Sequence, residues 1–166
     1  MAGRGFAAVC AAAGFAVTLE DVMPAKLRQA DEELAEFKGL VRLVMTVEDA
    51  VRDADVVVDF VPDELESKLE IWSMIDRMAP PKTVMCTPSD ALSITDLASC
   101  TYRGDRCVMV RGLGSASVRL LRAAETSDGA IQVVAALFSG LGVEWSAEAD
   151  PDLPMLLKNM RAARIS

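Results

Sequence analysis

The chain has 166 residues, of which 52% are apolar and 25% are charged, a balance that suits one folded domain and excludes a disordered chain. Its formal net charge of −8 argues against nucleic acid or an anionic membrane as a partner, because phosphate binding needs a basic surface. The chain contains no histidine and its four cysteines form no CxxC pair, which excludes the usual cysteine–histidine zinc sites.

The N-terminus and the cysteines indicate where the protein works. Arg4 is followed by about a dozen apolar residues, which superficially resembles a signal peptide. The run is too short to span a bilayer, and Gly14 interrupts it before a predicted strand, so we interpret it as the first helix. Cys10 and Cys86 lie in apolar runs typical of buried, reduced thiols, and we therefore expect a cytoplasmic protein.

Short β-branched runs alternate along the chain with segments of helical spacing. In chain order, the pattern predicts helix 5–13, strand 16–19, helix 24–37, strand 41–45, helix 47–52, strand 56–60, helix 66–78, strand 83–86, helix 94–99, strand 107–110, helix 129–141 and strand 143–145. Such alternation requires crossover connections, which produce a parallel sheet with helices on its faces. The sequence therefore predicts an α/β domain with a doubly wound, mostly parallel sheet over residues 1–147.

Helix starts and the C-terminal end add detail to this outline. Thr46, Ser93 and the run 126–128 resemble N-caps of the helices that follow them. Residues 151–166 carry a row of apolar residues followed by basic ones, which predicts an amphipathic terminal helix. We assign residues 148–166 to a C-terminal helical extension that packs on the domain, forms a dimer contact, or connects to a further domain.

A partial dinucleotide signature opens the chain. Gly3 leads into the first helix, and the following strand ends in Glu20 and Asp21. In a dinucleotide-binding βαβ unit, a glycine loop opens a helix that holds the pyrophosphate, and an acidic residue about 20 positions on binds a ribose. Gly3 fits the third glycine and Asp21 the acid, with Glu20 as the alternative. The first two glycines and the first strand would precede Met1, so we expect the fold to lack its first strand, or the reading frame to continue upstream.

Longer motifs carry a family resemblance. Residues 53–68, DADVVVDFVPDELESK, are similar to DADLVIEAVPEDLELK, and residues 92–98, LSITDLA, are similar to LSITELA. Residues 105–108 match the strand that begins ERVIG in the same family. In this order the motifs resemble the NAD-binding domain of the L-3-hydroxyacyl-CoA dehydrogenases, over residues 3–147. The resemblance implies a Rossmann-like fold that lacks the family's first strand, with NAD as the cofactor.

The same resemblance implies a set of cofactor-binding residues. Asp21 would bind the adenosine ribose, which favours NAD because a carboxylate repels the 2′-phosphate of NADP. Val61 and Asp63 would lie in the loop after the family's fourth strand, Lys68 would be the lysine on the cofactor side, and Thr87 stands at the first serine of the SNTSS turn. For Asp63 and Lys68 the alternative is a solvated pair at a helix start.

The resemblance fails at the catalytic residues. The family's catalytic histidine belongs to an HFFNP motif, where residues 111–115 here read RGLGS. Arg111 takes the histidine position and cannot accept a proton, because an arginine side chain stays protonated. Arg122 stands near the orienting glutamate, and Asp90 at the serine that approaches the substrate hydroxyl.

Other roles for these residues stay open at this stage. Asp90 or Glu125 would serve as a base if burial raised its pKa. Arg111 and Arg122 would alternatively hold a phosphate or a carboxylate.

We therefore expect an NAD-binding protein of the 3-hydroxyacyl-CoA dehydrogenase family, within fatty acid metabolism, with weak or no catalysis. NAD(H) and acyl-CoA are the expected ligands, and a homodimer is an expected assembly. The alternative is a non-enzymatic module that senses a nucleotide or assembles with a partner.

Overall fold

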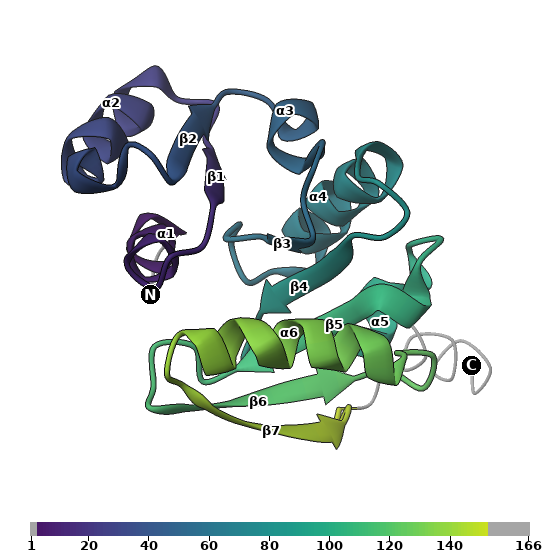
Figure 1. Cartoon of the computed structure of the whole chain (residues 1–166). Helices are drawn as coiled ribbons and strands as arrows, with labels where there is room; N and C mark the ends of the chain where they lie inside the picture. Colours follow the sequence, from purple (N-terminus) through teal and green to yellow (C-terminus); the bar gives the residue numbers. More distant parts are fainter. Residues whose placement is uncertain (1–2, 153–166) are drawn as a thin grey trace.

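The strands form two sheets in the computed structural model, which describes residues 3–152. A parallel pair joins β1 (Val17–Glu20) to β2 (Val41–Val44). The second sheet has the order β3-β4-β5-β6-β7 (Figure 1), with the strands Val56–Val58, Val84–Pro88, Cys107–Arg111, Ser117–Arg122 and Glu144–Ala149. Within it only β5 and β6 are antiparallel. The predicted α/β class with a mostly parallel sheet is confirmed.

Helices cover both faces of the five-stranded sheet. The described helices are α1 (Gly3–Ala12), α2 (Pro24–Glu33), α3 (Val47–Val51), α4 (Leu65–Met78), α5 (Ile94–Ser99) and α6 (Asp128–Gly140), with 3₁₀ turns at Ala35–Phe37 and Gly104–Arg106. Of these, α2 packs against the β1–β2 pair rather than the larger sheet. Successive strand residues face opposite layers: Val108 and Val110 pack towards α6, whereas Cys107 and Met109 pack towards α4 and α5. Figure 1 shows α6 across one face of the sheet and α5 behind it.

The two sheets meet where a doubly wound fold has its first strand. Doubly wound sheets follow the order 3-2-1-4-5-6, and β2-β1 and β3-β4-β5 supply the positions on either side of strand 1. Among residues 3–152, β1 and β3 therefore lack a neighbour on their facing edges, and the fold misses the first strand as predicted. Side chains bridge this place instead: Phe6 of α1 stacks against Phe60 at 5.6 Å and Phe138 at 6.3 Å between ring centroids.

The structure differs from the predicted elements mainly at β6. The strand was not predicted, because Arg119 and Arg122 interrupt its apolar residues, yet Val118 and Leu120 are fully buried against α6. The turn that leads into it depends on glycine, since Gly112 has a φ of 80°, a region that favours glycine. The helix predicted over 24–37 ends earlier, at Glu33, and the strand predicted over 143–145 continues to Ala149.

The predicted N-caps are confirmed. Thr46, Ser93 and Ser127 each accept a hydrogen bond from the backbone N–H three residues on, at the starts of α3, α5 and α6. The predicted C-terminal helix lies outside the described residues apart from its first two positions.

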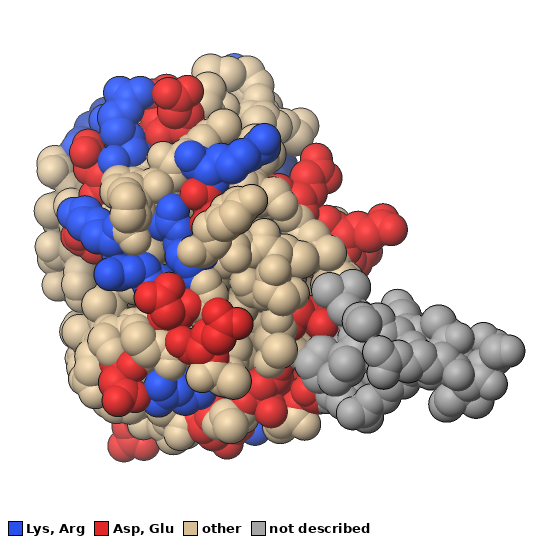
Figure 2. Space-filling view, turned by 90° about the vertical axis from the view of Figure 1, so that its right-hand side faces the viewer, with Lys and Arg blue, Asp and Glu red and all other residues tan. Residues whose placement is uncertain are grey.

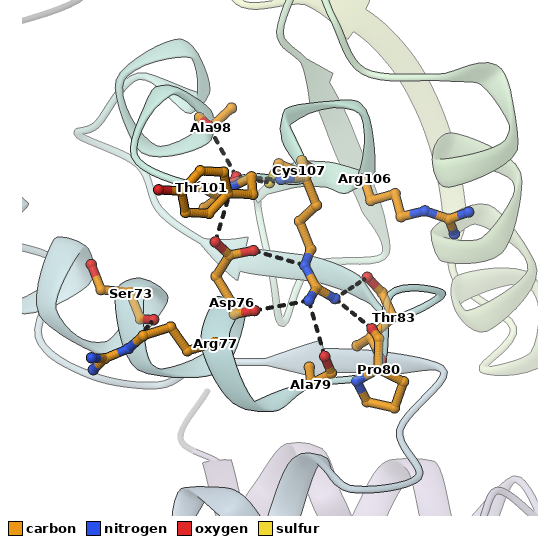
Figure 3. Close-up of polar contacts among 12 residues, drawn as sticks. Ser73, Asp76, Arg77, Ala79, Pro80, Thr83, Ala98, Thr101, Arg106 and Cys107 are labelled. Atoms are coloured by element: carbon orange, nitrogen blue, oxygen red, sulfur yellow. Dashed lines mark hydrogen bonds and ion pairs between the residues drawn. The ribbon is translucent and has the colours of Figure 1, made fainter.

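The arginine Arg103 closes the connection between α4 and β4. Its guanidinium donates to the Asp76 carboxylate at 2.9 Å and to four backbone carbonyls, those of Asp76, Ala79, Pro80 and Thr83, at 2.7–3.2 Å. Figure 3 shows these acceptors converging on one guanidinium group. The last carbonyls of a helix have no partner within the helix, so the Arg103 side chain completes the end of α4.

The surface carries charges of both signs. Figure 2 shows Lys and Arg side chains interleaved with Asp and Glu over one face. Within residues 3–152, no helix combines the length and the apolar character that crossing a membrane requires.

Burial divides the four cysteines, and we expect only one of them to react in the folded protein. Cys10, Cys86 and Cys107 are buried, whereas Cys100 is exposed. Burial raises the pKa of the Cys10 thiol to about 11 and that of Cys107 to about 12, and it raises the pKa of Cys86 as well. Because the thiolate is the reactive form, Ellman's reagent should titrate Cys100 rapidly and the other three thiols only on unfolding.

The control for this titration is Cys100→Ser, which should remove the rapid phase and leave the slow one unchanged. Rapid reaction of more than one thiol in the native protein would contradict the burial of the core cysteines.

Candidate functional site

A crevice of about 290 Å³ opens at the carboxyl ends of β3, β4 and β5. In open α/β sheets, ligands bind outside these strand ends, where the direction of winding reverses. The crevice is lined by segments that follow each strand, together with the start of α1: Gly3, Phe60, Val61, Asp63, Lys68, Pro88, Ser89, Asp90, Val110 and Leu113. The structure thus brings Gly3, Val61, Asp63 and Lys68, four of the predicted cofactor residues, into one place.

The amino end of α1 borders this crevice. A Cβ atom at Gly3 would lie 3.4 Å from the Phe60 ring, in van der Waals contact, so the start of α1 packs closely against the residue that follows β3. The first turn of α1 carries no acidic residue, which leaves its positive end available to an anion. This geometry fits the pyrophosphate of a dinucleotide, as the sequence predicted for Gly3.

Asp21 follows β1 of the two-stranded sheet and is not among the described residues that line the crevice. Because α1 runs back along β1, the amino end of the helix and the carboxyl end of the strand face the same side. The Asp21 carboxylate accepts a hydrogen bond from the Met23 N–H at 2.8 Å, and Lys26 lies 4.0 Å away. Burial, and then the charge of Asp21, raise the pKa of the alternative residue, Glu20.

Asp63 joins two of the loops that line the crevice. Its carboxylate accepts hydrogen bonds from the Ser89 hydroxyl at 2.6 Å and from the Asp90 N–H at 3.1 Å. The loop after β3 is thereby fixed to the loop after β4. Lys68 is bonded elsewhere, so the alternative of a solvated Asp63–Lys68 pair is wrong.

Lys68 belongs to a buried polar cluster beneath the crevice. Its side chain is 1% exposed, and Nζ donates to Asp59 Oδ1 at 2.7 Å and to the carbonyl of Pro88 at 3.2 Å. The indole N–H of Trp72 donates to the other oxygen of Asp59 at 2.8 Å. The sequence prediction missed Asp59 and Trp72, although an acid directly after a buried strand is a signal for such a partner.

Thr87 lies on β4, one residue before the crevice. It is completely buried, and its hydroxyl has no hydrogen-bond partner among the described residues. The residues that follow it, Pro88 to Asp90, form the crevice wall. Its predicted role as a cofactor contact stays a prediction.

Arg111 ends β5, next to Val110 of the crevice wall, and the sequence resemblance matches it to the family's histidine. It is 8% exposed. Its Nη2 donates to the Leu92 carbonyl at 2.9 Å and pairs with the Asp152 carboxylate. Its Nε is buried without a hydrogen-bond partner among the described residues. A permanently charged, ion-paired group therefore stands where the family needs a proton acceptor.

Of the three other candidates for catalytic work, Arg122 and Glu125 lie away from the crevice. Arg122 pairs in register with Val108, in the amino-terminal half of β5, and binds Asp128. Glu125 is exposed and lies beside Gly104, which precedes β5. Both residues are therefore at the opposite end of the strand from the crevice, and Glu125 as a base there is wrong. Asp90 does line the crevice, with an exposed side chain.

Asp150 fixes the chain after β7 to the start of α5. Its carboxylate accepts hydrogen bonds from the Ser93 hydroxyl at 2.6 Å and from the N–H and hydroxyl of Thr95 at 3.1 and 3.0 Å. Burial acts to raise the pKa of Asp150, but these bonds and one from the Asp152 N–H outweigh it and lower the pKa. No sequence signal identified this contact, because its partners are 55 and 57 residues away.

Comparison of the sequence with known proteins identifies relatives of this chain. The family model described as "3-hydroxyacyl-CoA dehydrogenase, NAD binding domain" matches residues 30–144. A probable 3-hydroxybutyryl-CoA dehydrogenase of Bacillus subtilis is 28% identical over 84% of this chain and 56% of its own length. The 3-hydroxybutyryl-CoA dehydrogenase of Bradyrhizobium diazoefficiens is 26% identical, over 89% of this chain and 58% of its own.

Solved structures show the same fold. A diketoreductase superposes with a TM-score of 0.83 at 24% identity, over 97% of this chain and 67% of its own. (S)-3-hydroxybutyryl-CoA dehydrogenase from Ralstonia eutropha gives a TM-score of 0.82 at 22% identity, over 89% of this chain and 60% of its own. The chain spans only a little over half the length of the curated relatives that it matches.

Proposed function

Because the chain belongs to the family of 3-hydroxyacyl-CoA dehydrogenase NAD-binding domains, we propose that it binds NAD in the crevice and has weak or no dehydrogenase activity. NAD is the cofactor of this family. The observation that carries the second half of the proposal is the buried Arg111, paired with Asp152 at the end of β5.

In this proposal, different residues bind different parts of the cofactor. The amino end of α1 at Gly3 would bind the pyrophosphate, and Asp21 would accept hydrogen bonds from the adenosine ribose. Val61 and Asp63 would contact the cofactor from the loop after β3, while Lys68 and Thr87 would support it from below. Bound NAD would supply the site for hydride transfer.

Proton transfer is the step that the chain's own residues do not support. Oxidation of a hydroxyl group needs a base within hydrogen-bond reach, and such a base contributes about 10²–10⁴-fold to the rate. Arg111 holds its proton at any physiological pH. Of the two carboxylates that line the crevice among the described residues, Asp63 is bound to Ser89 and Asp90 is exposed, which favours weak catalysis over efficient catalysis.

The names of the relatives support a proposal for the ligand and the metabolic role of the protein. Several of them are named as dehydrogenases of 3-hydroxybutyryl-CoA or hydroxyacyl-coenzyme A, which supports acyl-CoA as a ligand and a place in fatty acid metabolism. The free, buried cysteines support a reducing compartment such as the cytoplasm. A homodimer stays a prediction.

Calorimetric titration with NADH and NADPH tests the cofactor assignment. We expect NADH to bind more tightly than NADPH. The Asp21→Asn variant should weaken NADH binding about fivefold, because a charged hydrogen-bond acceptor contributes about 1 kcal/mol more than a neutral one. The same variant should bind NADPH better, since the repulsion of its 2′-phosphate is removed.

The matched control is Asp31→Asn, an exposed residue of α2, which should change neither affinity. Absence of NADH binding would remove the proposed function and leave the alternative, a module that acts through a protein partner. Turnover of acetoacetyl-CoA with NADH should stay near background, and rapid turnover would contradict the loss of catalysis.

A further inference from the structure

We propose that Arg111 anchors the carboxylate group of a small organic acid at the end of β5, beside the crevice, and that Asp152 occupies this anchor when no acid is bound. The inference deepens the proposed function and rests on it only for the position of the cofactor beside this anchor. It assigns a ligand class to a residue that replaces a proton acceptor.

The position of Arg111 suits a ligand contact. It is the last residue of β5, next to Val110 and two residues before Leu113, which line the crevice; its own side chain does not line it but is buried beside Leu92 and paired with Asp152. The hydrogen bond from Nη2 to the Leu92 carbonyl holds the side chain under the loop that follows β4. A buried guanidinium fixed in this way loses little freedom when it binds a ligand.

One hydrogen-bond donor of Arg111, its Nε–H group, has no acceptor among the described residues. Nε and Nη2 form one edge of the guanidinium fork, whose two parallel N–H groups match the two oxygens of a carboxylate. Nη2 pairs with one oxygen of Asp152, whereas Nε is buried without a partner among the described residues. A buried donor without an acceptor is costly. A ligand carboxylate that spans both nitrogens would satisfy Nε, which Asp152 does not.

Asp152 can be displaced from this contact. Its side chain is 43% exposed, compared with 10% for Arg111, so its carboxylate can return to solvent. Its backbone stays in place through Asp150, which accepts from the Asp152 N–H at 3.1 Å and binds Ser93 and Thr95. Asp152 is therefore held near Arg111 as a tethered competitor for external carboxylates.

The charge of the crevice favours a carboxylate over a phosphate. Asp63 and Asp90 both line it, and a doubly charged phosphate is repelled by them more strongly than a singly charged carboxylate. The planar two-oxygen geometry of a carboxylate also matches one edge of the fork.

The test uses propionate as the probe, with propionamide as its uncharged match and inorganic phosphate as the competing anion. Binding is followed without NAD by the ¹H–¹⁵N signal of the Arg111 Nε–H group. We expect propionate, but not propionamide, to shift this signal. Asp152→Asn should tighten propionate binding about tenfold, because removal of the competitor frees the binding-competent state.

The matched control is Glu148→Gln, which breaks an exposed ion pair with Arg119 on β6 and β7 and should leave propionate affinity unchanged. Arg111→Lys keeps the charge but loses the fork, and it should weaken binding at least as much as Asp152→Asn strengthens it. Since the wild-type signal reports the contact directly, misfolding of an Arg111 variant would not obscure the result.

Three outcomes would overturn the inference: an Arg111 Nε–H signal that propionate leaves unmoved, equal affinity of the wild type and Asp152→Asn, or a preference for phosphate. Because the titration contains no NAD, failure of NADH to bind would remove the proposed function and leave this result standing. Binding of NADH with no response to propionate would overturn this inference and leave the proposed function standing.

Discussion

Replacement of Arg103 by alanine is expected to lower the free energy of unfolding by about 3–5 kcal/mol, the range for breaking a buried ion pair from one side. Arg103 and Asp76 are 10% and 5% exposed, so the variant leaves a buried carboxylate without its cation. It also leaves the carbonyls of Ala79, Pro80 and Thr83 without the donor that each now has. Urea unfolding at constant pH measures the loss.

Two further variants sharpen this prediction. Arg103→Lys should recover only part of the loss, because an ammonium group is a point donor and cannot reach five acceptors arranged around a planar fork. Arg106→Ala removes a neighbouring arginine that makes an exposed hydrogen bond to the Lys82 carbonyl. It should change stability by less than about 0.5 kcal/mol. Equal effects of Arg103→Ala and Arg106→Ala would show that the end of α4 does not depend on this guanidinium.

The buried cluster beneath the crevice gives the second large effect. Lys68→Met should destabilise the fold by about 3–5 kcal/mol, because the Asp59 carboxylate, 2% exposed, would lose its cation. Asp59→Asn in the same chain should restore part of this loss, since a neutral amide can still accept from the Trp72 indole at that position. A double-mutant cycle should therefore give a coupling energy of about 0.5–3 kcal/mol.

The control for this cycle is Lys82→Met, which breaks the exposed pair with Asp55 and should cost less than about 1 kcal/mol. Additive effects of the two substitutions in the buried cluster would contradict a direct pair. NADH titration of Lys68→Met under conditions where it stays folded separates the two roles of this residue. If Lys68 only supports the Pro88 carbonyl, the affinity should change little, whereas a direct cofactor contact should weaken binding markedly.

Local sequence patterns were sufficient for much of the fold. The β-branched runs predicted β1 to β5 with small errors at the ends, and Thr46, Ser93 and Ser127 were recognisable as caps because the backbone N–H that donates to each lies only three residues away. The strand β6 was missed because its burial depends on α6 and β5 rather than on a continuous apolar run.

The candidate site, like the fold, could be predicted from the sequence only in part. Gly3, Val61, Asp63, Lys68 and Asp90, which line the crevice, could be predicted from motifs at the start of α1 and in the segments after β3 and β4. The partners of the charged residues were not predicted. Lys68 binds Asp59 rather than Asp63, and Arg111 binds Asp152, which is 41 residues away. The second pair depends on where the chain after β7 passes relative to β5, which no local pattern in the sequence shows, whereas Asp59 stands directly after a buried strand and could have been identified.

The division of the strands into two sheets has a consequence for how the protein unfolds. Among the described residues, no ladder of backbone bonds connects the β1–β2 pair with the five-stranded sheet, so α1 and α3 hold the two together through side chains. The amino-terminal third can then open as a cooperative unit of its own while the remainder stays intact. A dinucleotide that touched both Asp21 and the loop after β3 would span this seam. Its binding would join the separate unfolding transitions of the two parts into one. The protein would then unfold as a single cooperative unit only in the liganded state.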